Sequence, residues 1–234
     1  MDSAVSEGLI SEQERPKLEN LMALAGFLDR IKVSYVVIGG AGCTPYMPER
    51  EKRASTPWPI SDLDIAVSDI TPEMSGNLNR GKVVSYVNID PILGISFSYE
   101  QIDGHYHFTP PNIERCCLFY SKVHKVTIRK EDISRPFNIE IDRRRIRFAR
   151  PEFIILTYMN PGLNEKRTVR LSDMLNNMGE DQIGVIGDYV SRRIMEGDLS
   201  KEHIIESEPL FARYGSKAAK IFYSDVVSAI TKAR

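Results

Sequence analysis

Two short patterns in the sequence contain the residue types that phosphate chemistry needs. The first is a glycine pair, Gly39 and Gly40, at the end of an apolar run. The second is Asp62 and Asp64, one residue apart and directly after Ser61. Glycines let a phosphate approach the backbone closely, and the free N–H groups at the start of a helix attract phosphate oxygens. Carboxylates suit Mg²⁺, which completes its coordination with water and phosphate oxygens.

Two buried strands must position these residues. Residues 33–38 (VSYVVI) are β-branched and aromatic, which predicts a strand that ends at the glycines, with a helix beginning near Ala41. Residues 62–68 (DLDIAVS) predict a second strand. Because strand side chains alternate, Asp62 and Asp64 leave one face and the larger apolar residues leave the other. A phosphate cradle beside a carboxylate pair indicates phosphoryl or nucleotidyl transfer.

The order and spacing of the two patterns resemble the nucleotidyltransferases of the DNA-polymerase-β superfamily. The resemblance is to their small bacterial and archaeal branch, which includes the AbiEii-like toxin proteins. Their signature is an apolar strand, Gly-Gly or Gly-Ser, a helix, and an apolar strand bearing Asp-x-Asp. The resemblance covers residues 20–70 and resumes more loosely over residues 145–173.

The resemblance implies an enzyme that moves a nucleoside monophosphate from an NTP to an acceptor hydroxyl. Asp62 and Asp64 would then be catalytic residues and hold the metal, Mg²⁺ or Mn²⁺, while the nucleotide would lie against Gly39, Gly40 and Ser61. The resemblance leaves three kinds of acceptor open: RNA, protein and a small molecule.

A third catalytic carboxylate is also implied, on a later strand. Glu114 has the spacing typical of the family, although Arg115 follows it where an apolar residue is usual. Glu140 and Asp142 share one face of a predicted strand and are rival candidates, but they run directly into the strand that precedes the helix at Pro151. The sequence does not decide between them.

Several positions depart from the family pattern. Trp58 and Ile60 stand where many relatives have Arg and either Thr or Ser, and the helix after Pro151 lacks the Lys that it often carries. These departures favour an alternative function, a catalytically inactive nucleotidyltransferase-like module that binds a nucleotide or a partner. A third hypothesis is a structural α+β protein in which the Asp-x-Asp pattern is incidental.

Five arginines between positions 143 and 150 have two interpretations. Arginine binds phosphate bidentately, so the cluster is a candidate patch for a triphosphate or for RNA. Arg145 and Arg147 also alternate with Ile146 and Phe148, as in a strand with one solvated face, and we prefer this second interpretation. A metal site at His105 and His107 is disfavoured because no third ligand is evident.

The remaining pattern predicts an α+β fold, a mixed-sheet nucleotidyltransferase fold with a C-terminal helical region. Residues 1–15 form a polar segment, residues 16–148 the nucleotidyltransferase-like domain and residues 149–234 the helical region. Residues 83–130 look like a β-rich insertion. The further predicted strands are 83–87, 95–99, 116–120, 123–128, 137–141 and 145–148. The predicted helices begin at residues 16 and 151 or cover residues 169–178, 183–195, 202–214 and 219–230.

Composition agrees with a folded soluble protein. Of the 234 residues, 42% are hydrophobic and 27% are charged, as in an ordinary folded protein. The net charge of −1 argues against a protein that binds nucleic acid over its whole surface. Three cysteines make neither a disulfide framework nor a zinc motif. We see no signal peptide and no apolar run of about 20 residues, so we expect no membrane span and a reducing cytoplasm.

Overall fold

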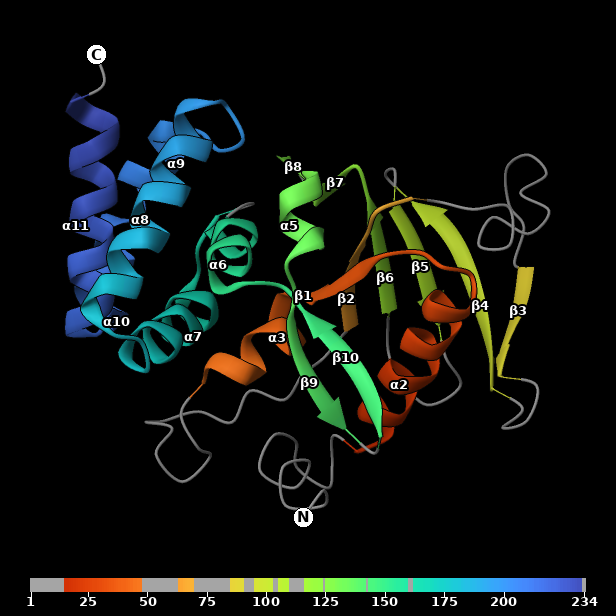
Figure 1. The fold of residues 1–234 in the computed structure, drawn as a ribbon. Coiled ribbons are helices and arrows are strands. Elements are labelled where there is room, and N and C mark those ends of the chain that lie inside the picture. The colour runs from red at the N-terminus through yellow and green to blue at the C-terminus, as the bar shows by residue number, and fades with distance from the viewer. Residues whose placement is uncertain are drawn as a thin grey trace. The chain divides into compact units, whose positions relative to one another are not determined.

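The chain forms two compact units whose segments interleave along the sequence. The first unit draws on residues 1–42, 59–123 and 128–149, and the second on residues 43–58, 124–127 and 150–234. The structure, a computed structural model shown in Figure 1, describes residues 15–47, 63–69, 85–90, 95–102, 105–109, 116–123, 125–141, 143–159 and 162–232. The two units are described separately below.

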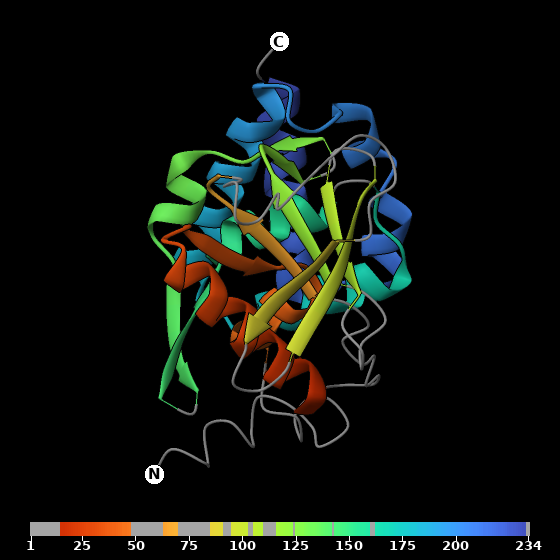
Figure 2. The same cartoon turned by 90° about the vertical axis from the view of Figure 1, so that its right-hand side faces the viewer.

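The first unit is built on a mixed sheet. Its described strands lie in the order β3-β4-β5-β6-β2-β1-β10-β9. β1 runs parallel to β10 and antiparallel to β2, and β2 runs parallel to β6. The antiparallel strands β3, β4 and β5, yellow in Figure 2, extend one edge. The strands are β1 Tyr35–Ile38, β2 Leu63–Val67, β3 Ser85–Asp90, β4 Ile95–Ile102, β5 His105–Thr109, β6 Cys116–Tyr120, β9 Phe137–Ile141 and β10 Arg144–Phe148, with a short β7 at Lys122–Val123.

Helix α2, Arg15–Arg30, supplies the core of this unit by packing on one face of the sheet (Figure 1). Because successive side chains of a strand point to opposite faces of the sheet, every second strand residue packs against this helix. Leu63, Ile65 and Val67 of β2 belong to this core, which confirms the apolar face predicted for that strand. Two shorter helices follow: α5 at Lys130–Ser134 lies in this unit, and so does α3 at Gly39–Cys43, directly after β1, except for its last residue, Cys43.

The second unit is helical. α6 is buried all along its length from Phe153 and packs against α7 and α8, while α11 packs against α7 and α8. Asn164 caps α7 by accepting a hydrogen bond from the backbone N–H of Arg167 at 2.9 Å. The elements are η2 Thr44–Tyr46, β8 Val126–Thr127, α6 Pro151–Met159, α7 Glu165–Asn176, α8 Glu180–Met195, α9 Lys201–Ile205, α10 Glu208–Tyr214 and α11 Lys217–Lys232.

The predicted α+β class, with a mixed sheet and C-terminal helices, is confirmed. Two predicted elements are wrong. The single strand over 123–128 is replaced by β7 and β8, because the chain reverses here and the backbone N–H of Ile128 bonds to the carbonyl of Ser121. The single helix over 202–214 is two helices, since Pro209 lacks an N–H and is accommodated only in the first turn of a new helix.

An ion pair inside the second unit is fully buried. Arg193 of α8 has no exposed surface, and its Nε donates to Asp198. The same guanidinium donates to the backbone carbonyl of Thr127 and to the hydroxyl of Tyr189, while Asp198 accepts from the Thr127 N–H at 3.0 Å. Burial raises the pKa of Asp198, but the bonds from Thr127 and Arg193 outweigh it and hold that pKa below its ordinary value. The network fixes residues 126–127 to the end of α8.

Removing Arg193 should therefore destabilise the protein strongly. Arg193→Met leaves Asp198 buried without its cation, which costs about 3–5 kcal/mol of unfolding free energy. The control is Arg192→Met on the exposed side of the same helix, which should change the unfolding free energy by less than about 0.5 kcal/mol. Urea unfolding of both variants makes the comparison, and equal losses would show that the buried pair is not important for stability.

The depressed pKa of Asp198 also predicts a pH dependence with a definite sign. Its stabilising contribution is complete above the unfolded pKa, about 3.9, and is lost as the pH falls through the lower folded pKa. The unfolding free energy should fall more steeply between pH 5 and pH 2 in the wild type than in Asp198→Asn, which cannot titrate. Parallel curves would contradict this assignment.

Candidate functional site

The pairing of β1 with β2 brings Asp64 to the glycine turn. In this antiparallel pair Asp64 is the register partner of Ile38, the last residue of β1. Gly39 follows Ile38 and begins α3. Asp64 is half-buried and lies on the opposite side of β2 from the core residues Leu63 and Ile65. Gly39 and Asp64, which are 25 residues apart in the chain, therefore lie side by side.

Gly39 and Asp64 are packed so closely that only glycine fits. The φ of Gly39 is 63°, in the left-handed region that disfavours residues with a Cβ. A Cβ built on Gly39 would lie 2.2 Å from the Oδ2 atom of Asp64 and 2.9 Å from its Cβ. The carboxylate therefore fills the space that a side chain would occupy, and lies against the backbone of the turn.

The far end of α3 is held by a buried polar cluster that sequence analysis did not identify. Cys43, the last residue of α3, is fully buried, and its thiol bonds to the Tyr158 side chain. The Tyr158 hydroxyl accepts a hydrogen bond of 2.8 Å from Nη1 of Arg170. Burial raises the pKa of Cys43 to about 12, so the thiol stays protonated and structural. Its sequence signals were an isolated cysteine and a tyrosine in a mostly apolar helix.

Most of the other predicted site residues lie outside the described residues. These are Ser61, Asp62, Glu114 and Asp142, together with Trp58 and Ile60. The strands that follow Asp62 and Glu114 are described, however: β2 and β6 are parallel neighbours in which Leu63 pairs with Cys116 and Asp64 with Cys117. The backbone of His105 and His107 lies in β5, in which His107 pairs with Cys117.

Glu140 lies far from Asp64. Glu140 pairs with Arg145, whereas Phe148 of the same strand pairs with Val37, one residue before Ile38. The two acids are thus three strands apart, roughly 14 Å across the sheet, and four residues apart along the strands, roughly 13 Å. Carboxylates at that separation do not share a metal ion. The register therefore removes Glu140 as the third carboxylate beside Asp64.

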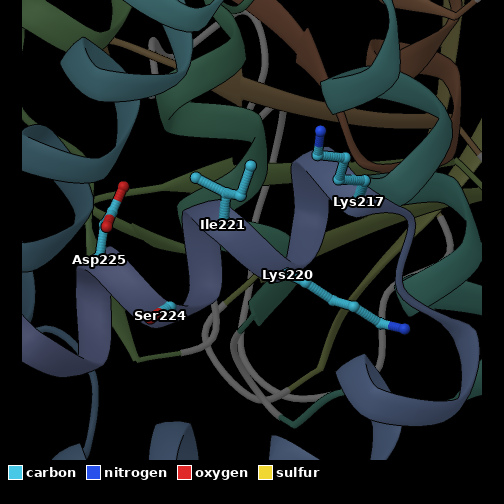
Figure 3. A pocket seen from close by; sticks show the side chains of 5 residues that line it. All are labelled: Lys217, Lys220, Ile221, Ser224 and Asp225. Carbon is cyan, nitrogen blue, oxygen red and sulfur yellow. The ribbon is translucent and has the colours of Figure 1, made fainter.

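Other site types are not seen in the described part of the chain. No group of three or more His, Cys, Asp or Glu residues there is placed to hold a metal. No described helix has the length and apolar character that crossing a bilayer requires. A surface hollow in the second unit contains none of the predicted site residues, and Figure 3 shows that its side chains come from one helix, α11: Lys217, Lys220, Ile221, Ser224 and Asp225.

Comparison with known proteins gives only distant likenesses. No family model matches the sequence, and no curated protein matches it at a significant level. Among solved structures, the lincosamide antibiotic adenylyltransferase LnuA with lincomycin bound has a TM-score of 0.44 at 10% identity, covering 72% of this chain and 99% of that one. The antibiotic-resistance factor ANT(2'')-Ia has a TM-score of 0.45 at 16% identity, covering 79% of this chain and 95% of that one.

A third likeness is to an antigenic nucleotidyltransferase-like protein from Paracoccidioides brasiliensis, with a TM-score of 0.42 at 13% identity. It covers 92% of this chain and 99% of that one. Likenesses at this level do not assign an activity to this chain.

The two glycines should respond differently to the same substitution. Gly39→Ala forces a Cβ into the left-handed region and against Asp64, and should lower the unfolding free energy by about 1–3 kcal/mol. Gly40 does not have a positive φ, so Gly40→Ala should leave the fold mostly intact while weakening NTP binding. Thermal melts and NTP titrations of both variants separate the two roles.

An equal loss of stability in the two variants would contradict the assignment of the strained position to Gly39. Normal NTP binding by Gly40→Ala would contradict the proposed approach of phosphate to its backbone.

Proposed function

We propose that this protein is a metal-dependent nucleotidyltransferase that moves a nucleoside monophosphate from an NTP to an acceptor hydroxyl. The observation that carries the proposal is the contact between Asp64 and the Gly39 turn. It holds a hard anionic ligand against the turn where β1 ends and α3 begins, and the next residue of that turn, Gly40, also has no side chain. The sequence pattern of a glycine pair followed by Asp-x-Asp supports the same chemistry.

The residues at the turn suit an Mg²⁺-triphosphate. Asp64 is half-buried at the beginning of β2, and Asp62, two residues earlier, would leave the same face if the strand pattern extends to it. These two carboxylates would hold Mg²⁺ or Mn²⁺, with phosphate oxygens and water as the other ligands. A divalent metal bound there supplies charge neutralisation for the triphosphate and lowers the pKa of a coordinated hydroxyl.

By elimination, Glu114 remains the candidate for the third acid in this proposal, because the register removes Glu140. β6 begins two residues after Glu114 and lies beside β2, with Cys116 opposite Leu63. Two residues span at most about 7 Å, so Glu114 is within reach of the same end of the sheet. Asp142 follows β9, and the N-terminal end of β10 beside it is remote from Asp64 in the register.

The proposed reaction is an in-line displacement at the α-phosphorus. The acceptor oxygen forms a bond to that phosphorus, the bond to the bridging oxygen of the β-phosphate breaks, and pyrophosphate leaves. The acceptor hydroxyl loses its proton to a base, for which the carboxylate of Glu114 or solvent is available. The chain's own contribution is to orient the triphosphate along Gly39–Gly40 and to hold carboxylate charge beside it.

Divalent-dependent NTP binding is the first test of this function. Calorimetric titration with ATP, GTP, CTP and UTP should give heat for at least one nucleotide in the presence of Mg²⁺, and much less in EDTA. Binding without transfer to any acceptor in a radiolabelled cell extract would support the inactive binding module instead. Failure of the folded protein to bind any NTP would exclude both functions.

Asp64→Asn is the second test. Replacing one of two neighbouring carboxylates removes like-charge repulsion when no cation is present, so the apo melting temperature should stay equal or rise. An amide carries no full negative charge, so the variant should lose the increase in melting temperature that Mg²⁺-NTP gives the wild type. That increase is readable, because a ligand at 100 times its Kd adds about 2.7 kcal/mol.

Asp69→Asn, at an exposed position just after β2, is the matched control and should keep the Mg²⁺-NTP increase. A large fall in the apo stability of Asp64→Asn would show instead that Asp64 is part of the structural framework.

A further inference from the structure

A row of titratable residues crosses the sheet of the first unit at the level of Asp64. In the register Asp64 is the partner of Cys117 in β6, and Cys117 is the partner of His107 in β5. His107 in turn is the partner of Glu100 in β4. Register partners share a face of a sheet, so these four residues lie on one face and at one level.

The face that carries this row is the face of the candidate site. Ile65 and Leu118 alternate with two members of the row and belong to the core on the other side of the sheet. Asp64, at one end of the row, lies against Gly39. Neighbouring strands are about 4.8 Å apart, so the backbone of His107 lies about 10 Å from that of Asp64 across the sheet.

The row extends from Asp64 in the direction away from β1. The strands follow one another in the order β1, β2, β6, β5 and β4, and Figure 1 labels all five. In the proposed function the triphosphate lies along Gly39 and Gly40, at the β1 end of the row, and pyrophosphate leaves there. The attacking and leaving oxygens are roughly in line with the phosphorus between them. The acceptor hydroxyl therefore approaches over β6 and β5.

His107 is the residue of the row that suits proton removal on this side. Histidine is the commonest general base, because its ordinary pKa of about 6.5 leaves it neutral at neutral pH. Cys117, between it and the candidate site, is buried. A carboxylate beside an imidazole fixes its tautomer and increases its basicity, and Glu100 is the register partner of His107. His105, two residues earlier on the same face, has the apolar partner Ile102.

We propose that His107, in place of Glu114 or solvent, is the base that removes the proton of the acceptor hydroxyl, and that Glu100 is its positioning residue. This rests on the proposed function and names the base for its reaction. The acceptor oxygen bonds to the α-phosphorus while the bond to the bridging oxygen breaks, and pyrophosphate leaves with that electron pair. The proton passes to a ring nitrogen of His107, which returns it to solvent.

The proposal has a pH dependence with a definite sign. In the described strands, the titratable residues beside His107 are Glu100 of β4 and Cys117 of β6, with His105 on its own strand. A carboxylate favours the charged imidazolium, so Glu100→Gln should lower the pKa of His107. Transfer requires neutral His107, so its rate should rise with pH through that pKa. The midpoint of this rise should move to lower pH in Glu100→Gln.

The first measurement requires neither NTP nor an acceptor. The carbon-bound imidazole protons of the four histidines are followed by NMR from pH 5 to pH 9. The signal that is missing in His107→Asn identifies His107. Its pKa should be lower in Glu100→Gln than in the wild type, whereas the pKa of His105 should be the same in both. An unchanged pKa of His107 would overturn the positioning role of Glu100.

The second measurement is pyrophosphate release from Mg²⁺ and the NTP that binds most tightly, with a cell extract as the source of acceptor and the extract alone as background. His107→Asn should lower the rate at pH 8 about 100-fold and leave the calorimetric Kd for NTP unchanged. His105→Asn is the matched control and should keep the rate. If His107→Asn fails to fold, the pH midpoint of Glu100→Gln makes the decision.

Three results would overturn His107 as the base: a wild-type rate in His107→Asn, an equal loss in His105→Asn, or the same pH midpoint in Glu100→Gln and the wild type. Calorimetry separates this proposal from the function on which it rests. No NTP binding by the wild type removes the function and the base together. NTP binding with transfer that persists at full rate in His107→Asn removes only the base.

Discussion

The space left by one missing Cβ determines the candidate site. At Gly39 the chain leaves β1 with a positive φ, and the Asp64 carboxylate occupies the position of the absent side chain. A residue with a Cβ would strain the turn and push the carboxylate away at the same time. Backbone geometry and the placement of charge are therefore one constraint. The antiparallel register that pairs Ile38 with Asp64 brings the carboxylate to this turn.

The sheet separates its structural and chemical roles by alternation. In β2, Leu63, Ile65 and Val67 pack in the core beneath α2, so the intervening Asp64 leaves the opposite face. In β10, Ile146 and Phe148 belong to the same core, while Arg147 between them forms an ion pair with Asp29 of α2. Strands that are fixed by burial on one side can carry charge on the other without losing stability. Both polar features depend on this arrangement.

Polar groups in the interior are paired with few exceptions. Arg193, Asp198 and Thr127 satisfy one another in the second unit, and Cys43, Tyr158 and Arg170 make a second buried cluster. Among the described side chains with buried polar atoms, the hydroxyl of Ser191 is the one without a hydrogen-bond partner. Such networks fix local positions because an unpaired buried charge costs several kcal/mol.

Local sequence patterns predicted correctly those strands and helices that have a strong periodicity or a clear signal at one end. The alternation in β2, the apolar run of β1, the start of α6 at Pro151 and the extents of β6 and β9 all follow from the sequence. Short-range patterns failed where a reversal depends on neighbouring structure, as between β7 and β8. They also failed to find α5, a single turn whose Asp132 side chain accepts from the backbone N–H of Arg129. Such a turn has too few residues for a periodic signal.

For the site, the sequence by itself determined the residue types: glycines that admit a phosphate and an aspartate that suits a divalent cation. Only the tertiary structure decided the distances, because side-chain spacing across a sheet depends on strand order and register and not on separation along the chain. Strand order places Asp64 against Gly39 and takes Glu140 about three strands away, although the sequence favoured Glu140 and Asp142 as strongly as Glu114. It also decides which arginines α2 holds and which remain exposed.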